Sequence, residues 1–156
     1  MKVLGIDPGT AACGYGIVQE SGGRLRATCH GWWRTSARER PEARLLTIFT
    51  GVQELIAQHA PDAVALEESY VGADARIALS VGQARGAVLV AAASVGVACT
   101  EYSPATVKQA VCGYGRADVR HHPWHVALRR PSLSWTIPYP QAAVPGSMPR
   151  TFTRKG

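Results

Sequence analysis

The fold is decided near the N-terminus, by the stretch 2-KVLGIDPGTAACGYGIVQE-20. Its first five residues, 2–6, form a short apolar run that is typical of a buried strand. The segment DPGTAACG at 7–14 then breaks the run with Pro and Gly, and YGIVQE at 15–20 resumes a strand pattern. The stretch therefore predicts two strands joined by a turn, with Asp7 placed directly after the first strand.

Strand and helix patterns alternate along the rest of the chain. A hairpin turn at 21–23 leads into a third strand, RLRATCHGWWRT, and apolar steps of three and four predict helices that begin near Pro41 and Asp74. The expected strands are 2–6, 15–20, 24–35, 62–68 and 97–102, and the expected helices are 41–60, 74–95 and 103–113. The apolar face of the second helix is expected to comprise Ile77, Val81, Ala84, Val88, Ala91 and Val95. Because crossover helices must lie on the faces of a sheet, we predict an α/β fold with a mixed five-stranded sheet flanked by helices.

Charge divides the chain into two parts. The 156 residues carry a net charge of +6, and residues 119–156 hold six of the 17 basic residues but none of the 11 acids. Residues 1–118 are therefore neutral, and they contain every predicted element. Residues 119–156 contain six prolines and show no apolar periodicity. We predict one α/β domain over 1–118 and an irregular basic segment over 119–156.

Several features indicate the compartment. Asp7 and Pro8 lie within the first ten residues, which is not the pattern of a signal peptide. The apolar run Gly86–Ala98 is too short to span a bilayer. The four cysteines are scattered without a CxxC pair, as is typical of thiols in a reducing compartment rather than of disulfides or zinc ligands. We expect a soluble, cytoplasmic protein without membrane contact.

Acidic residues follow two of the predicted strands. Asp7 comes directly after the first strand, and Glu67 and Glu68 come after the apolar strand 63–66. Open α/β sheets place ligands at such carboxyl ends, and the burial of an unpaired carboxylate is costly. Two acids on different strands could therefore converge on one cation, and their oxygens suit Mg²⁺ or Mn²⁺. Taken alone, Asp7 is equally consistent with a residue that caps a turn.

Four segments carry a family resemblance: GIDPGTAACGYGIV, PDAVALEESYV, VGQARGAVLVAA and YSPATVKQAVCGYG. Together they resemble the RuvC family of Holliday junction resolvases, in that family's order and spacing, over residues 1 to about 118. DPGT alone would not be specific, since sugar kinases and actin-like ATPases, which need a second phosphate-binding domain, open with a similar turn. The resemblance implies an RNase H-like fold, a homodimer, and Mg²⁺-dependent nicking of four-way DNA junctions in recombination and repair. It leaves open the use of Mn²⁺ and the docking of branch-migration proteins.

By position, the resemblance implies roles for four residues. Asp7 and Glu67 match the family's first two catalytic, metal-binding carboxylates. Tyr70 matches an aromatic residue that stacks on a junction base, an interaction of about 1–3 kcal/mol per base. Lys108 matches a DNA-binding lysine near the scissile phosphate. From the residues alone, Tyr70 is also consistent with a half-buried aromatic residue in a loop, and Lys108 is also consistent with a solvent-exposed lysine on a helix.

The match stops after GYGRAD. Val119 stands where the family has a second lysine, and no acid follows it, although the family carries two further metal ligands on a later helix. Three interpretations of residues 119–156 stay open. In the first, a reading-frame error means that the segment is translated in the wrong frame. In the second, it is a basic arm that binds nucleic acid. In the third, His121, His122 and His125 form a substitute metal site.

The missing ligands affect the expected function. With two of four metal ligands absent, Asp7 and Glu67 repel each other without enough positive charge to balance them, so we predict strongly impaired cleavage. Junction binding depends on phosphate contacts and is expected to persist. The leading hypothesis is a Mg²⁺-dependent junction endonuclease. The alternative is a structure-selective protein that binds four-way junctions without cleaving them.

Overall fold

The computed structural model describes residues 1–9, 11–68, 74–112 and 116. The strands are β1 Lys2–Asp7, β2 Ala12–Ser21, β3 Arg24–Arg34, β4 Ala63–Glu67 and β5 Ala98–Tyr102, and the helices are α1 Pro41–His59, α2 Ala75–Ser94 and α3 Pro104–Cys112. The predicted order of elements is confirmed. The segment 119–156, predicted to be irregular, lies outside the described residues.

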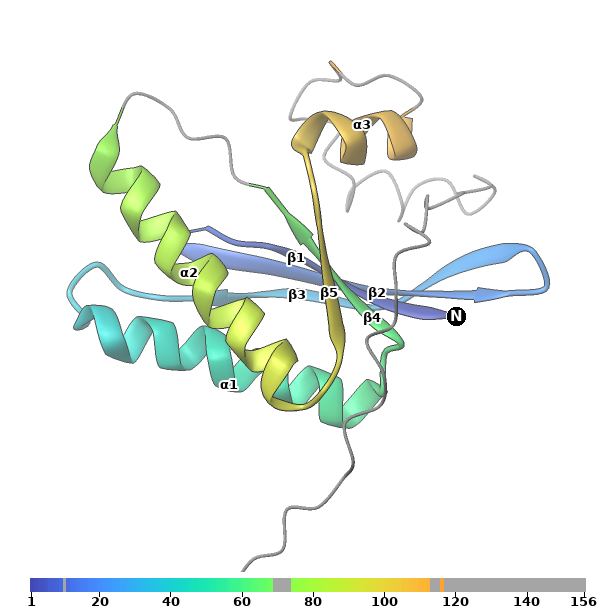
Figure 1. Cartoon of the computed structure of the whole chain (residues 1–156), viewed down its shortest axis with the longest axis horizontal. Coiled ribbons are helices and arrows are strands. Elements are labelled where there is room, and N and C mark those ends of the chain that lie inside the picture. Colours follow the sequence, from blue (N-terminus) through green and yellow to red (C-terminus); the bar gives the residue numbers. More distant parts are fainter. Residues whose placement is uncertain (10, 69–73, 113–115, 117–156) are drawn as a thin grey trace, which may run out of the picture.

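The five strands form one mixed sheet in the order β3-β2-β1-β4-β5 (Figure 1). β1 pairs antiparallel with β2, and β2 with β3, whereas β1 pairs parallel with β4, and β4 with β5. The predicted α/β fold with a mixed sheet is therefore confirmed. This topology brings the last residues of β1, β3, β4 and β5 to one edge of the sheet, which we call the carboxyl edge. Its central positions are Asp7 and Glu67.

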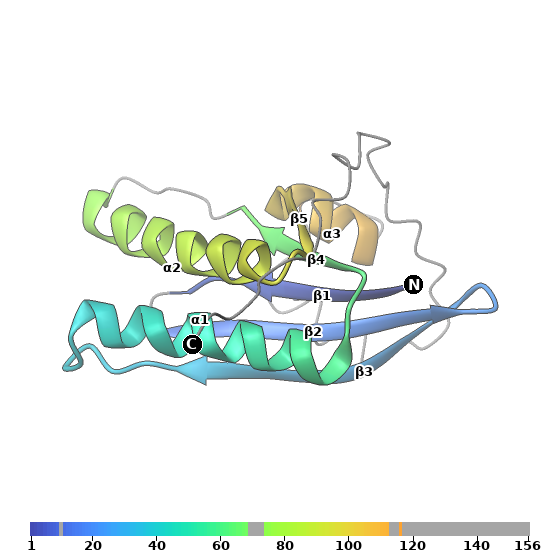
Figure 2. The same ribbon diagram turned by 60° about the horizontal axis from the view of Figure 1, so that its bottom comes forward.

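Helices α1 and α2 pack side by side on one face of the sheet, and α3 lies on the opposite side (Figures 1 and 2). Apolar residues of the sheet and of both helices form one core: Leu4, Ile6, Ile17, Val64 and Leu66 from the strands, and Ile48, Val52, Leu55, Ile56, Ala84, Val88, Ala91 and Ala92 from the helices. Side chains alternate between the faces of a strand. Asp7 follows the buried Ile6 and Glu67 follows the buried Leu66, so both acids lie on the face of the sheet away from α1 and α2.

Helix α2 begins and ends as its sequence predicts. The Asp74 carboxylate accepts hydrogen bonds from the backbone N–H groups of Arg76 and Ile77, at 2.9 and 3.3 Å, which is the arrangement of an N-cap. Gly96 follows the helix with a φ of +73°, a conformation that favours glycine. The expectation that Ile77 and Val95 lie in the buried face is wrong, since they are 58% and 46% exposed. Ile77 lies in the first turn, which extends past the end of β4 (Figure 1), and Val95 lies beyond the last helical residue.

Helix α2 is more apolar than a surface helix requires. It has 20 residues, and an 18-residue stretch of it has a mean hydropathy of 1.4, so by length and composition it could cross a membrane, a test that core helices also pass. This apolar stretch of α2 is longer than the run Gly86–Ala98, which alone is too short to span a bilayer. Only 22% of it is buried within the chain, and Leu79, Leu89 and Val90 are 67%, 36% and 60% exposed.

The cysteines of the described residues are unpaired, as predicted. Cys13 is buried in the core, and Cys29 and Cys99 are half-buried. Burial raises the pKa of the Cys13 thiol to about 12, and the negative charge of Asp7 adds to the rise. A thiol with so high a pKa stays protonated and unreactive. The side chain of Cys112 lies outside the described residues.

Candidate active site

Asp7 and Glu67 end two strands that lie next to each other at the centre of the sheet. β1 and β4 are parallel, and Ile6 pairs with Leu66 near their carboxyl ends, so the next residue of each strand is an acid at the carboxyl edge. Ile6 and Leu66 are buried beneath α1 and α2, and Asp7 and Glu67 therefore share the opposite face. The topology thus brings together two carboxylates that are 60 residues apart in the sequence.

Two glycines shape the chain around Asp7. A Cβ atom at Gly9 would overlap the carbonyl oxygen of Ala12, so the turn after β1 can bend back into β2 only with glycine at this position. Gly14 pairs with Asp7 across the sheet, and a Cβ at Gly14 would lie 3.7 Å from the Asp7 Cβ. Any side chain at position 14 would therefore stand beside the carboxylate. The sequence alone gave no role to Gly14, because its importance depends on the register of β1 and β2.

The two carboxylates are close enough to affect each other's ionisation. The pKa of Glu67 is raised from 4.5 to about 7, first by burial and next by the negative charge of Asp7. Lys108 opposes this rise with its positive charge. The structure therefore places Asp7, Glu67 and Lys108 within electrostatic range of one another. Because the two negative charges repel each other, a cation bound between the carboxylates would stabilise both of them.

Helix α3 brings Lys108 to the carboxylates from the face opposite α1 and α2 (Figure 1). β5 ends at Tyr102, whose carbonyl oxygen accepts a hydrogen bond of 2.8 Å from the Glu68 N–H and so ties the ends of β4 and β5 together. Ser103 then begins the helix, because its hydroxyl oxygen accepts a hydrogen bond of 3.2 Å from the Thr106 N–H. Lys108 follows within the next turn, half-buried beside Glu67.

The raised pKa of Glu67 predicts a pH-dependent cost to folding in the metal-free protein. Because the folded chain holds the Glu67 proton more tightly than the unfolded chain, stability falls as pH rises from 4.5 through about 7. We expect Glu67→Gln to raise the melting temperature in EDTA at pH 8, and to leave it unchanged at pH 4. Glu67 is partly exposed and therefore screened by solvent, so the gain should be about 1 kcal/mol, or roughly 2–4 °C. Differential scanning fluorimetry measures both values.

Glu68→Gln is the matched control for this prediction. Glu68 is the adjacent residue, carries the same charge and is exposed. Its replacement should shift the melting temperature at neither pH. An equal gain from both variants would mean that the general negative charge of this edge, and not the pair of Asp7 and Glu67, opposes folding.

The remaining predicted residues have different outcomes. Glu68, to which no role was assigned, is exposed next to Glu67. Tyr70 lies outside the described residues, as do Val119, His121, His122 and His125, so their roles stay predictions. Within the described part of the chain, no group of three or more His, Cys, Asp or Glu side chains is placed to hold a metal ion. The described carboxylates that meet at the carboxyl edge are thus a pair and not a larger cluster.

Comparison with known proteins identifies the family. Residues 3–127 match the family model of the crossover junction endodeoxyribonuclease RuvC. The RuvC protein of Heliobacterium modesticaldum is 51% identical over 118 residues, which cover 76% of this chain and 73% of that protein. The RuvC protein of Moorella thermoacetica is 50% identical over 117 residues, which cover 75% of this chain and 70% of that protein.

Solved structures agree with the sequence match. Thermus thermophilus RuvC in complex with its Holliday junction substrate is 38% identical and superimposes with a TM-score of 0.71, over 78% of this chain and 74% of that one. The yeast mitochondrial Holliday junction resolvase is only 12% identical and shows the fold alone, with a TM-score of 0.51 over 69% of this chain and 54% of that one. The sheet order and flanking helices are those of the RNase H-like fold. Since both the sequence and the fold match over most of the chain, this protein belongs to the RuvC family of crossover junction endodeoxyribonucleases, which are hydrolases of DNA.

Proposed function

We propose that this chain binds four-way DNA junctions and hydrolyses a phosphodiester bond at the carboxyl edge, with Mg²⁺ held by Asp7 and Glu67. The observation that carries the proposal is the proximity of these two acids, whose negative charges interact and which end neighbouring parallel strands. The junction as substrate is supported by the Thermus thermophilus relative, whose structure contains one.

The acid pair fits Mg²⁺ in its chemistry. Mg²⁺ prefers oxygen ligands, and proteins commonly bind it through one or two carboxylates while substrate phosphates and water supply the remaining ligands. Asp7 and Glu67 offer such a pair, and the pKa of Glu67, raised by burial and then by the charge of Asp7, supports the proposal that a cation would be favoured there. Mn²⁺ shares these preferences and is expected to substitute. When bound, the ion would stabilise negative charge on the reacting phosphate and lower the pKa of an attacking water.

The chain's own residues orient and accommodate the DNA. Lys108 provides a positive charge at the same site as the two acids and is suited to pair with the phosphate next to the bond that breaks. Gly14 leaves the space beside Asp7 open, so that a sugar-phosphate backbone can approach the carboxylate. Tyr70 keeps its proposed role in stacking on a base near the exchange point of the junction.

A second function is favoured by the small number of acids at the site. Asp7 and Glu67 form a pair without a third acid among the described residues, and a pair can hold a cation more weakly than four ligands do. The chain would then bind junctions without cleaving them at a useful rate. Gel-shift and cleavage assays on the same fluorescent four-way junction separate the two functions. Binding with Mg²⁺-dependent nicking supports the endonuclease, binding alone supports the second function, and the absence of binding contradicts both.

We propose that the active form is a homodimer that meets through α2. Leu79, Gly82, Gly86, Leu89 and Val90 follow one another at helical spacing, so they form a single stripe along the helix. In the described part of the chain, neither glycine has a neighbour within 4 Å of the position that a Cβ would take, and the three larger residues are exposed. A smooth, apolar stripe allows a second copy of α2 to approach closely. A two-fold axis would then present two sites to the symmetric strands of a junction.

Charge within this stripe should separate the subunits. We expect Val90→Lys to convert the dimer to a monomer, because an ammonium group buried between two apolar helices loses its hydration. Size-exclusion chromatography with light scattering measures the mass. Leu46→Lys is the control, since Leu46 is 58% exposed on α1 and Val90 is 60% exposed on α2. A Val90→Lys dimer, or a monomeric wild-type chain, would contradict the proposed interface.

The remaining expectations follow from the family. The curated relatives are bacterial, and we place this protein in the cytoplasm, where it would act on DNA without membrane contact. The apolar surface of α2 serves the dimer in this account and not a bilayer. Docking of branch-migration proteins stays a prediction.

A further inference from the structure

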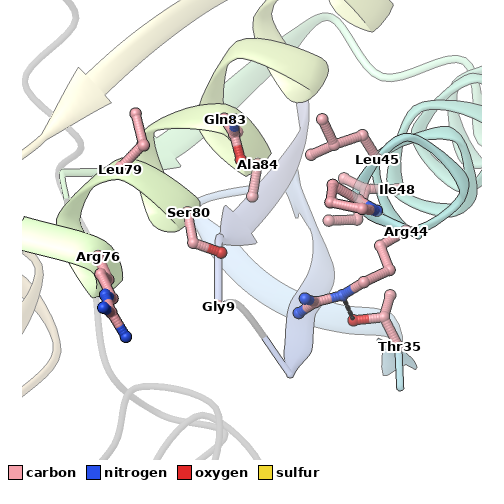
Figure 3. Close-up of a pocket in the computed structure, with 11 residues that line it drawn as sticks. Gly9, Thr35, Arg44, Leu45, Ile48, Arg76, Leu79, Ser80, Gln83 and Ala84 are labelled. Carbon is pink, nitrogen blue, oxygen red and sulfur yellow. Dashed lines mark hydrogen bonds between the residues drawn. The ribbon is translucent and has the colours of Figure 1, made fainter. Parts of the chain in front are cut away.

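A second site lies at the carboxyl edge, on the other side of the turn that follows Asp7. It is a pocket of about 260 Å³ between the start of α1 and the start of α2, and Gly9 and Thr35 close its base (Figure 3). Arg44 of α1 and Arg76 of α2 both line it. We call it the arginine pocket. Lys108 and the proposed metal site lie across the sheet from it, on the side of α3.

The arginine pocket is positively charged. Among the described residues, its lining includes two guanidinium groups and no carboxylate. The acids of the two adjoining helix starts are engaged elsewhere, since Glu42 pairs with Arg40 at 2.5 Å and Asp74 caps its own helix. The first turns of both helices border the pocket, so their N-terminal partial charges add to the positive potential. An anion is the ligand that these groups favour.

The polar groups converge on the space between the helices. The Arg44 Nε donates a hydrogen bond of 3.1 Å to the Thr35 hydroxyl oxygen, which fixes the orientation of the guanidinium. Figure 3 shows that guanidinium and the hydroxyl of Ser80 pointing into the pocket from opposite helices, with Arg76 at its rim. A planar guanidinium held in this way presents a donor geometry that matches a phosphate group. The pocket thus offers an oriented guanidinium on the side of α1 and a second, exposed guanidinium at its rim.

We propose that the arginine pocket binds a phosphate of the DNA backbone, a few nucleotides from the bond that is cleaved. This inference rests on the proposed function, because it extends the path of the same strand. Gly9 follows Asp7 by two residues, which span at most about 7 Å, and successive phosphates on one strand advance about 3.4 Å along the helix axis. A strand that contacts both sites must therefore bend around the carboxyl edge at this turn, from the metal site on the side of α3 to the pocket between α1 and α2. The pocket fixes the register of the strand, and Arg44 and Arg76 are positioning residues, not catalytic ones.

The salt dependence of junction binding tests the proposal. Each phosphate contact contributes about 0.9 to the slope of the logarithm of the binding constant against the logarithm of salt concentration. We expect Arg76→Gln to lower that slope by about one and to weaken binding of a fluorescent four-way junction in EDTA, measured by anisotropy. Arg24→Gln is the control, because it removes the same exposed charge at the first residue of β3, at the opposite edge of the sheet. A slope for Arg76→Gln equal to that of the wild type would overturn the proposal.

A second measurement does not depend on the junction. Titration of the full chain with inorganic phosphate should shift the NMR signals of the Arg44 side chain and the Gly9 amide, and Arg76→Gln should reduce these shifts. The absence of shifts in the wild type would overturn the pocket as an anion site. Shifts together with an unchanged salt slope would show a site for a free anion and contradict the DNA contact. If the wild type binds no junction at all, the proposed function fails, and the phosphate titration still decides whether the pocket binds anions.

Discussion

Replacing residues 119–156 with the C-terminal segment of the Heliobacterium modesticaldum relative is expected to speed the cleavage of a four-way junction in Mg²⁺ at least about 100-fold. The 156-residue chain contributes Asp7 and Glu67, and its final 38 residues contain no acid. The family resemblance implies two more metal ligands in that region. A site that loses groups which stabilise the charge of the transition state typically loses on the order of 10²–10³ in rate. The relative is 51% identical over 118 residues, so the joined segment should meet a closely similar sheet.

Single-turnover cleavage of a labelled synthetic junction measures this rate for both proteins. Gel-shift assays should show junction binding by both, because the proposed phosphate contacts and the proposed dimer do not depend on the replaced segment. Equal cleavage rates for the two proteins would contradict the prediction. That result would mean that the native residues 119–156 complete the site by other means, for which His121, His122 and His125 are the candidates.

Asp7→Asn, placed in the same chimera, is expected to lower the cleavage rate by about 100-fold or more while junction affinity changes little. An amide keeps the size of the side chain and removes the negative charge that a divalent cation requires. Asp7 is the acid of the pair whose charge acts on Glu67, so its loss should also return the Glu67 pKa toward its ordinary value. The change leaves Lys108 and the other proposed DNA contacts in place. Binding should therefore persist where cleavage does not.

Glu68→Gln is again the matched control, since Glu68 is an exposed acid at the same edge. Its cleavage rate should stay within about twofold of the parent chimera, as expected for a surface change away from the reacting groups. Retention of full activity by Asp7→Asn, or an equal loss in Glu68→Gln, would show that the carboxylate at the end of β1 has no special part in the reaction.

The central strands and the acid pair were predictable because local sequence determines them. The apolar run before Asp7 and the one before Glu67 each end in an acid, and helical crossovers force β1 and β4 to lie parallel, so both acids reach one edge. The apolar spacing after Pro41 likewise predicted a helix, and in α1 the apolar residues Ile48, Val52 and Leu55 are buried. In these cases the relation between residue and environment is set within a few positions of the chain.

Features that depend on where elements end in space were not predictable. Ile77 fits the apolar face of α2 by spacing, yet the sheet does not extend beneath it. Arg44 and Arg76 share no motif and come from different helices, so their convergence follows only from the packing of α1 against α2. The importance of Gly14 depends on strand register. Tyr70 and residues 119–156 remain predictions from the sequence.

The position of a bound Mn²⁺ ion tests the central claim most directly. Crystals of the 156-residue chain soaked in Mn²⁺ should show an anomalous scattering peak between the carboxylates of Asp7 and Glu67, at the carboxyl ends of β1 and β4. Crystals of Asp7→Asn soaked in the same way should lack that peak. A wild-type map without a peak at these carboxylates, or with the ion bound only elsewhere, would contradict the account.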